Sequence, residues 1–567
     1  MRWRDGARRT RGPVEGETPG ARTLFLLLAV ENLLINYTAT AMNVALSALV
    51  ADLRTTLTGV QAVISLYALV VAAFLITGSK LGARHGYRRI FVLGGGVFVL
   101  GALIASFTPS LPFMLVGWSV LQGLGVALMH PALMAMLTTA FTGAVRTKVL
   151  STLAMTSGIG SAAGPLLGGL LTNYLTWRVS FLMAAAVTLA VTWLLRRTVD
   201  AGRFPGRTGR RFDVLGVVLS TTGLILLDVA GLLAGRYGLL KARQDFVVLG
   251  HTLLERGGLS PVPVLSGTGL VVLAAFAGRE WRLVTGGGDP LVRVQVLRNR
   301  TVRTGISTQI MQFVVSGGAL FLVPVFLQTT LGFGALHSGV VLLPIALGLL
   351  LAARPAARRI GNGRMTHRAA AMGAFVCMGV GCGAVAALFS PHAQGVTAVG
   401  LALAPGILCI GLGRGMATTL TDLVQSAPEP DEVSDVTGLS YTAGYLGSSF
   451  GVALAGALMT GTLLYAFEAG VNDSHVLAAR QKELVTRTLE NQVQITAASD
   501  DALRAKLLSR GITGAASDEL VRINGRARQR ALTVSITGMA ALAAVGWLTA
   551  RRIPVPAGAA PVTGPRR

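Results

Sequence analysis

The sequence GSAAGPLLGG occupies residues 160–169 and lies in an apolar run from about residue 150 to 171. Gly160, Gly164 and Gly168 recur every four residues, so they share one face if the run is helical. Small residues at this spacing allow two helix backbones to approach closely inside a bilayer. The same spacing returns in a later run at Gly447, Gly451 and Ala455. We interpret these glycines as packing residues of membrane helices.

The composition also indicates a membrane protein. Of the 567 residues, 52% are hydrophobic and 13% are charged, and the mean hydropathy is +0.62. Soluble globular chains carry about 25% charged residues. The composition therefore argues against a soluble enzyme, and its high hydrophobicity excludes an intrinsically disordered chain.

The apolar runs are numerous and long. A helix needs about 20 apolar residues to cross the hydrocarbon core of a bilayer. Fourteen runs approach this length, at about 23–47, 59–78, 90–107, 114–137, 150–171, 179–195, 214–234, 262–277, 305–327, 338–353, 369–389, 396–420, 437–464 and 531–549. The first is too long for a cleavable signal peptide and has no small-residue cleavage site. We predict an all-α, polytopic membrane protein with 14 transmembrane helices.

The net charge of +25 raises the possibility of nucleic-acid binding, but the basic residues alternate between loops. With the N-terminus inside, 33 basic residues fall in cytoplasmic segments and six in short external ones. Ten more lie in residues 465–530, a segment too long for the positive-inside rule to apply. Both termini are therefore predicted to be cytoplasmic, and nucleic acid is not an expected partner.

The spans are predicted to divide into two six-helix halves. These are residues 23–195 and 305–549, separated by basic loops and two linker helices in residues 196–304. The loops LGARHGYRR (81–89) and RRIGNGR (358–364) occupy the same position in each half. Paired halves with a site at their interface are typical of secondary transporters.

The remaining segments have their own predictions. Residues 1–22 are a basic cytoplasmic N-terminus and 550–567 a cytoplasmic tail. The external insertion 465–530 is expected to form a small cap with short amphipathic helices at about 475–492 and 501–508.

No enzymatic or metal-binding pattern is present in the sequence. A Walker A motif, HExxH and a nucleophile elbow are absent. Cys377, Cys382 and Cys409 fit neither a redox pair nor a zinc site. We expect no enzyme activity, no cofactor and no metal.

Ionisable groups inside spans are candidates for function, because burying a charge in hydrocarbon is costly. Glu31 is either a protonatable carboxylate in a substrate path or a local partner of a neighbouring helix, with Asn36 and Thr38 on the same helix. Arg414 and Asp422 either neutralise each other through partners, or Arg414 receives an anionic substrate group. Asp228 lies in a linker helix and is a weaker candidate. Gln122, Gln309 and Gln312 are suited to orienting a ligand or to bonding between helices.

Several segments resemble the motifs of one family. The strongest is residues 160–169 followed by Trp177, Arg178 and Phe181. Other similar segments are Asn43-Val44-Ala45-Leu46, residues 121–125 with Pro131, and Gln328, Gly332, Ser338, Gly339 and Pro344. On these residues the chain resembles the major facilitator superfamily, specifically its fourteen-helix drug:proton antiporter branch.

The resemblance implies roles for two sets of residues. Gly82, Arg84, Gly86 and Arg88 correspond to a loop motif that switches conformation, and Gly160, Gly164, Pro165, Gly168 and Gly169 to the antiporter packing motif. Three charged positions of the family are neutral here, at Thr38, Ala83 and Ser119. The packing motifs persist, whereas the coupling motifs have changed.

We therefore expect a secondary transporter that exports a hydrophobic or amphipathic small molecule, such as a drug or antibiotic, by alternating access with proton coupling. An uncoupled facilitator, a lipid-type flippase, and a non-transporting membrane sensor or scaffold are the alternatives. The expected setting is a bacterial plasma membrane, and the expected partners are substrate, protons and lipid, with the chain a monomer.

Overall fold

The apolar runs fold as long helices, as the hydropathy pattern predicts. The computed structural model describes residues 20–555, apart from 142, 201, 203, 205–212, 243, 249–250, 287, 289, 292, 390–394, 428–432, 479–481, 483–499 and 509–511. Most of the basic N-terminus (1–22), of the tail (550–567) and of the helix predicted at 475–492 lie outside the described residues.

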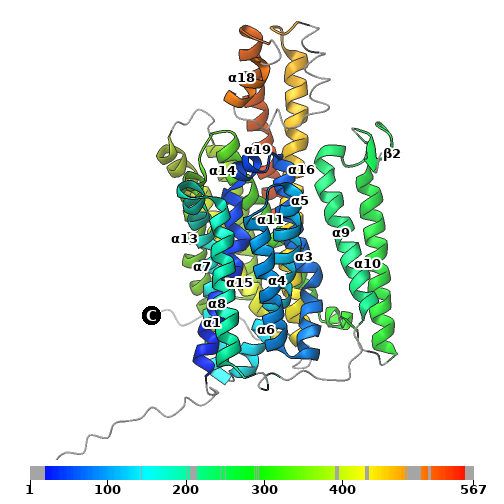
Figure 1. Ribbon diagram of the computed structural model, residues 1–567, viewed down its shortest axis with the longest axis vertical. Helices are drawn as coiled ribbons and strands as arrows, with labels where there is room; N and C mark the ends of the chain where they lie inside the picture. The colour runs from blue at the N-terminus through cyan, green and yellow to red at the C-terminus, as the bar shows by residue number, and fades with distance from the viewer. Residues whose placement is uncertain are drawn as a thin grey trace, which may run out of the picture.

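The N-terminal half is a bundle of six spans (Figure 1). Two spans are interrupted: α1 continues through η1 into α2, and α5, η2 and α6 form a single span. The elements are α1 (Ala21–Ala41), η1 (Met42–Val44), α2 (Leu46–Asp52), α3 (Leu57–His85), α4 (Tyr87–Ser106), α5 (Leu111–Met114), η2 (Leu115–Gln122), α6 (Gly123–Ala140), α7 (Gly143–Tyr174) and α8 (Trp177–Thr198).

The C-terminal half repeats this plan, with a short helix α12 before α13. Its elements are η4 (Val294–Arg298), α11 (Arg300–Thr329), α12 (Ala335–Val341), α13 (Leu343–Gly361), α14 (His367–Leu388), α15 (Val396–Ser426), α16 (Val433–Asp473), α18 (Asp500–Leu508) and α19 (Ala515–Ala550). The structure is consistent with the predicted pair of six-helix halves.

The two linker helices, α9 (Val214–Tyr237) and α10 (Pro261–Thr285), stand beside the bundle (Figure 1). A short antiparallel hairpin, β1 (Phe246–Val248) with β2 (His251–Leu254), joins them. This hairpin is the one sheet within the described residues, and the sequence analysis did not predict it. The all-α class is otherwise confirmed.

Thirteen helical segments among the described residues are long and apolar enough to cross a membrane. The 32-residue helix α7 occupies the position of the fifth predicted run. The structure is consistent with fourteen spans, and that exact number stays a prediction.

Most of the described residues in the segment 465–530 belong to the ends of two long helices. Helix α16 continues to Asp473, and α19 begins at Ala515, both well beyond the predicted apolar runs. These ends and α18 project together from the bundle (Figure 1). Leu503, Leu520 and Ile523 are buried there, so apolar contacts explain why the helices extend past the hydrocarbon. Helix α18 matches the one predicted at 501–508.

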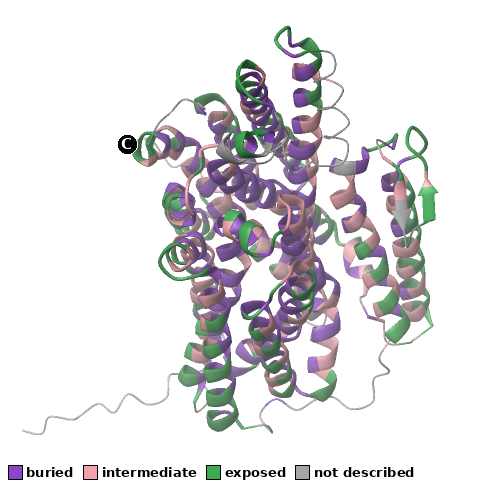
Figure 2. Cartoon of the chain, turned by 45° about the horizontal axis from the view of Figure 1, so that its top comes forward, coloured by how far each residue is buried: buried purple, intermediate pink, exposed green. Residues whose placement is uncertain are grey.

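Glycines bring the helices into close contact, as their spacing predicts. A Cβ atom on Gly164 would collide with Thr40 of α1, and one on Gly168 would lie 2.7 Å from the Ala41 carbonyl oxygen. In the other half, a Cβ on Gly447 of α16 would lie 2.6 Å from the Ile310 carbonyl oxygen of α11. The two halves thus use the same packing device. In both halves, buried residues run along the middle of the bundle (Figure 2).

Candidate transport site between the two halves

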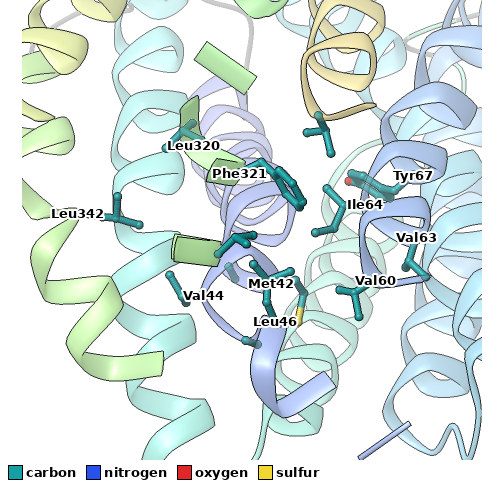
Figure 3. Packing of buried hydrophobic residues seen from close by; sticks show 14 of the residues in the cluster. Met42, Val44, Leu46, Val60, Val63, Ile64, Tyr67, Leu320, Phe321 and Leu342 are labelled. Atoms are coloured by element: carbon teal, nitrogen blue, oxygen red, sulfur yellow. The ribbon is translucent and has the colours of Figure 1, made fainter. Parts of the chain in front are cut away.

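The two halves meet closely at the side that the predicted topology places outside the cell. Figure 3 shows Met42, Val44 and Leu46 packed beside α3 and near Phe321 of α11. Gln328 at the end of α11 donates from Nε2 to the Val44 carbonyl oxygen at 2.9 Å. Its Oε1 accepts from the Ser47 N–H at 2.9 Å. This apolar contact and its hydrogen bonds close the predicted external side.

The antiporter motif contacts both halves. Gly160, Gly164 and Gly168 face α1 within the N-terminal half. Gly169 faces α12, where an added Cβ would lie 2.6 Å from the Ala335 carbonyl oxygen, and the Pro165 carbonyl oxygen lies against Gly339 of α12. One helix therefore packs tightly inside its own half and against the other.

An ion pair joins the halves at the opposite, predicted cytoplasmic end. Lys80 of α3 lies 3.2 Å from the Asp435 carboxylate of α16. Arg293, just before η4, lies 3.7 Å from the other oxygen of that carboxylate. Both lysine and carboxylate are largely shielded, with side chains 23% and 11% exposed.

Aromatic and amide side chains gather between these two ends. His130 of α6 packs edge-to-face against Tyr441 of α16, with ring centroids 4.5 Å apart. Tyr67 of α3 packs against Trp118 of η2 at 5.8 Å. The His130 ring nitrogens and the Gln122 amide are buried and have no hydrogen-bond partner within the described part of the chain. Such unsatisfied groups are costly unless a ligand or water meets them.

Gln122 ends a π-helical stretch, η2, in which backbone hydrogen bonds span five residues. π-Helical turns occur frequently at functional sites. Ser119, in the same stretch, donates to the Val63 carbonyl oxygen of α3 at 2.8 Å. Of the predicted amides, Gln122 is buried with neither side-chain atom hydrogen-bonded within the described residues.

Arg414, Thr418 and Asp422 follow one another every four residues and share one face of α15. Thr418 and Asp422 are exposed, although they lie within a membrane-spanning segment. Asp422 is close enough to Tyr441 to act on it electrostatically, and Tyr441 is the residue that meets His130. Asp422 therefore lies near the aromatic contact that joins the two halves. Among the described residues, Arg414 and Asp422 do not form the ion pair that we considered.

The polar residues that we considered on α1 form hydrogen bonds within the N-terminal half. Glu31 is fully buried and accepts a hydrogen bond from Thr188 of α8 at 2.9 Å. Asn36 donates to the Asn32 carbonyl oxygen and Thr38 to that of Ile35, both on the same helix. Since α8 belongs to the same half as α1, the Glu31 carboxylate lies inside the N-terminal half rather than between the halves.

Gln309 is committed to contacts within the C-terminal half. Its Oε1 accepts from Ser440 of α16 at 2.8 Å, and its Nε2 donates to Thr421 of α15 at 3.3 Å. Gln312, one turn further, is buried in α11.

The loop motif after α3 forms a tight turn. Gly86 adopts φ of 94°, which favours glycine. A Cβ atom on Gly82 would lie 2.6 Å from the Tyr87 ring. Arg88 donates to the Arg196 carbonyl oxygen at 2.7 Å, whereas Arg84 is exposed. Ala83, at a position where the family has a carboxylate, is half-buried.

Sequence reasoning missed several groups at the contact between the halves. His130, Tyr67 and Tyr441 are single residues in apolar runs, and nothing in their spacing marks them. Asp228, which the sequence analysis considered a weaker candidate, lies on α9 and is buried against α3 and α16. The described residues contain no group of three His, Cys, Asp or Glu that could hold a metal ion.

The chain thus has two similar helical halves that pack against each other at one side and have polar side chains between them. This arrangement is that of a multi-pass membrane transporter. The family model described as Major Facilitator Superfamily matches residues 31–452. The chain belongs to the Major Facilitator Superfamily.

Curated relatives cover most of the chain. The probable actinorhodin transporter of Streptomyces coelicolor is 28% identical over 470 residues, 82% of this chain and 77% of that protein. The puromycin resistance protein of Streptomyces alboniger is 31% identical over 445 residues, 77% of this chain and 81% of that one. The drug efflux pump JefA of Mycobacterium tuberculosis is 26% identical over 549 residues, 95% and 99% of the two chains.

A bacterial homologue of the human lysosomal transporter Spinster, solved facing inward, has the same fold. It superposes with a TM-score of 0.59 at 14% identity and covers 95% of this chain and 98% of its own.

Proposed function

We propose that this transporter exports a hydrophobic or amphipathic small molecule across the bacterial plasma membrane, driven by inward movement of protons. The observation that carries the proposal is that relatives matching over three quarters of the chain or more are named as a probable actinorhodin transporter, a puromycin resistance protein and a drug efflux pump. The chain acts as a monomer with both termini in the cytoplasm, and its work is transport without covalent chemistry.

The substrate site lies between the halves, near His130, Tyr441 and Gln122. Aromatic faces suit an apolar or cationic ring system. The unpaired amide of Gln122 supplies both a donor and an acceptor. Asp422 and Arg414 line the neighbouring face of α15, where a charged group of the substrate would meet them.

Transport proceeds by alternating access. The Gln328 contact holds the predicted external side closed, while the Lys80–Asp435 pair holds the opposite end. When one of these contacts breaks while the other holds, the central residues are open to one side of the membrane. Alternation between the two arrangements opens them to each side in turn.

Everted membrane vesicles from a bacterial host that lacks its own drug pumps provide the test. Vesicles with this chain should accumulate ethidium or puromycin when respiration acidifies the lumen, and vesicles without it should not. Collapse of the proton gradient by a protonophore should abolish the accumulation. Uptake of neither probe would contradict the export proposal, and uptake that resists the protonophore would favour an uncoupled facilitator.

A further inference from the structure

The linker helix α9 carries a carboxylate that is buried between the two halves. Asp228 is 0% exposed. The Oγ of Ser65, on α3 of the N-terminal half, lies 3.0 Å from Asp228 Oδ1 and 3.2 Å from Oδ2. The Oγ of Ser449, on α16 of the C-terminal half, donates to Oδ1. A single carboxylate therefore accepts hydrogen bonds from both halves.

We propose that Asp228 is a proton-binding site that couples the proton gradient to the relative movement of the halves. The inference rests on the proposed function and specifies which group carries the proton. In the described part of the chain, Asp228 and Glu31 are both buried in the bundle, but only Asp228 has contacts from both halves.

The two serine hydroxyls can form hydrogen bonds with the Asp228 carboxyl group in both its protonated and its ionised form. When the carboxylate is ionised, both serine hydroxyls donate to it. When it is protonated, its O–H donates to Ser449 Oγ, and Ser449 Oγ donates instead to the Ser65 carbonyl oxygen, 3.0 Å away. Ser65 Oγ lies 3.3 Å from the Ser449 carbonyl oxygen, which gives it a corresponding acceptor. Because no buried polar atom loses its partner, the penalty for an unsatisfied group is avoided in both states.

The surroundings leave the ionised form without a counter-charge. Asp228 forms no ion pair with Lys or Arg among the residues that the structure describes. Burying an unpaired charge among apolar helices costs several kcal/mol, and protonation removes that charge.

On α9 itself, Arg236 lies eight residues from Asp228, about 12 Å at the rise of an α-helix. The other titratable groups that the structure describes on the packed helices are more remote or neutral. Lys80, Asp435 and Asp213 lie 14 or 15 residues along α3, α16 and α9 from Ser65, Ser449 and Asp228, about 20 Å at the rise of an α-helix. Arg279 of α10 contacts Asp213, and Glu280 lies at the same end of α10. Tyr445, one turn before Ser449, and Tyr67, two residues after Ser65, are uncharged at neutral pH.

Helix α9 is held firmly enough to keep Asp228 in place. Leu224 is buried in a cluster with Leu69 and Ala73 of α3. A Cβ on Gly235 would lie 2.9 Å from the Cα of Ala457 on α16. When the halves move, Ser65 and Ser449 must separate, which exposes the carboxylate to water. A proton taken up from the external side occupies Asp228 in the closed arrangement and leaves to the cytoplasm when the contact opens on that side.

Infrared difference spectra of the purified transporter test proton binding without any substrate. Spectra recorded at acid and alkaline pH should contain a carboxyl C=O band that Asp228→Asn removes. Ser220→Ala is the matched control, because Ser220 lies two turns earlier on α9 and bonds only the Val217 carbonyl oxygen of its own helix. The control should retain the band. A pH-difference spectrum unchanged in Asp228→Asn would overturn the proposal.

Ethidium transport in proteoliposomes tests the coupling between proton binding and transport. Accumulation is measured in empty vesicles under a pH gradient, and exchange in vesicles loaded with ethidium. Asp228→Asn should lose ethidium accumulation driven by a pH gradient and retain ethidium exchange at equal pH, since asparagine preserves the hydrogen bonds. Asp228→Glu should recover part of the gradient-driven accumulation. Accumulation at the wild-type level in Asp228→Asn, or equal loss of accumulation and exchange, would contradict a proton-carrying role. If the wild-type chain moves no ethidium, the proposed function fails for that probe, and the infrared result still decides whether Asp228 binds a proton.

Discussion

The side-chain amide of Gln328 donates to the carbonyl oxygen of Val44 and thereby fastens the C-terminal half to the N-terminal half. The donor stands at the end of α11 and the acceptor in η1, where α1 gives way to a tighter turn. Gln328 is 5% exposed, so water cannot readily replace its partners. Opening of the predicted external side therefore requires this contact to break.

Replacement of Gln328 by Ala should shift the transporter toward the state that is open at the predicted external side. The change leaves the Val44 carbonyl oxygen and the Ser47 N–H without their partner, a loss of about 1–3 kcal/mol for the closed state. Distances between spin labels on the external ends of α2 and α12 should lengthen. Thr329→Val is the control, since Thr329 Oγ1 donates only within its own helix. Identical distance distributions in Gln328→Ala and wild type would refute the assignment.

Loss of the charge at Asp435 should loosen the opposite end. Asp435→Asn removes the partner of both Lys80 and Arg293. Because the pair is partly exposed, we expect a shift of about 1 kcal/mol toward the inward-open state, and a smaller one at high salt. Labels at the cytoplasmic ends of α3 and α16 would report it. Lys80→Gln, which removes the cationic partner of Asp435, should shift the distances in the same direction, and unchanged distances in both variants would argue against a role for the pair.

The packing role of the glycines could be predicted from the sequence, because their spacing within one helix determines which face they share. Four-residue periodicity places Gly160, Gly164 and Gly168 on one face whatever the partner is, and the structure confirms close packing there. The span pattern and the two halves were predictable for the same reason, since hydropathy and charge are properties of single segments.

The direction of each polar group was not predictable, because it depends on which helix lies opposite. Glu31 and Thr38 were expected on a common face, but their hydrogen bonds go to α8 and to their own helix. Asp228 was considered peripheral, since it lies in a linker helix. Only the packing of α9 against α3 and α16 brings it to the contact between the halves.

Substitution of Gly164 by Leu should destabilise the N-terminal half. The new side chain would collide with Thr40 of α1, and overpacking of this kind costs about 1–3 kcal/mol. Thermal unfolding in detergent should begin at a lower temperature. Gly96→Leu is the matched control on α4, because a Cβ at Gly96 meets nothing within 4 Å. Equal melting temperatures for the two variants would contradict the packing argument.

Acid pH should loosen the predicted cytoplasmic end of the linker pair. Burial tends to raise the pKa of Asp213, but the hydrogen bonds and charge of Arg279 and the N–H of Gly216 outweigh it, so the pKa lies below its usual value. A lowered pKa in the folded state stabilises that state above the unfolded pKa of about 4, and the contribution is lost as the pH falls further. Protection from hydrogen exchange at the start of α9, measured relative to the intrinsic exchange rate at each pH, should therefore decrease in acid. Asp213→Asn, which keeps the helix cap, should lose this pH dependence of the protection, and an unchanged pH profile in the variant would exclude Asp213 as its source.

Replacement of Glu31 by Gln should leave proton-driven transport in place. Glutamine can still accept from Thr188, and it removes a buried carboxyl group whose hydrogen bond, within the described residues, comes from the N-terminal half. We expect ethidium accumulation within about twofold of wild type, a difference of roughly 0.4 kcal/mol. The same vesicle assay compares this variant with Asp228→Asn under one pH gradient. Because both substitutions neutralise a buried carboxylate, loss of coupling in Glu31→Gln with normal coupling in Asp228→Asn would move the proton site from the contact between the halves to the interior of the N-terminal half.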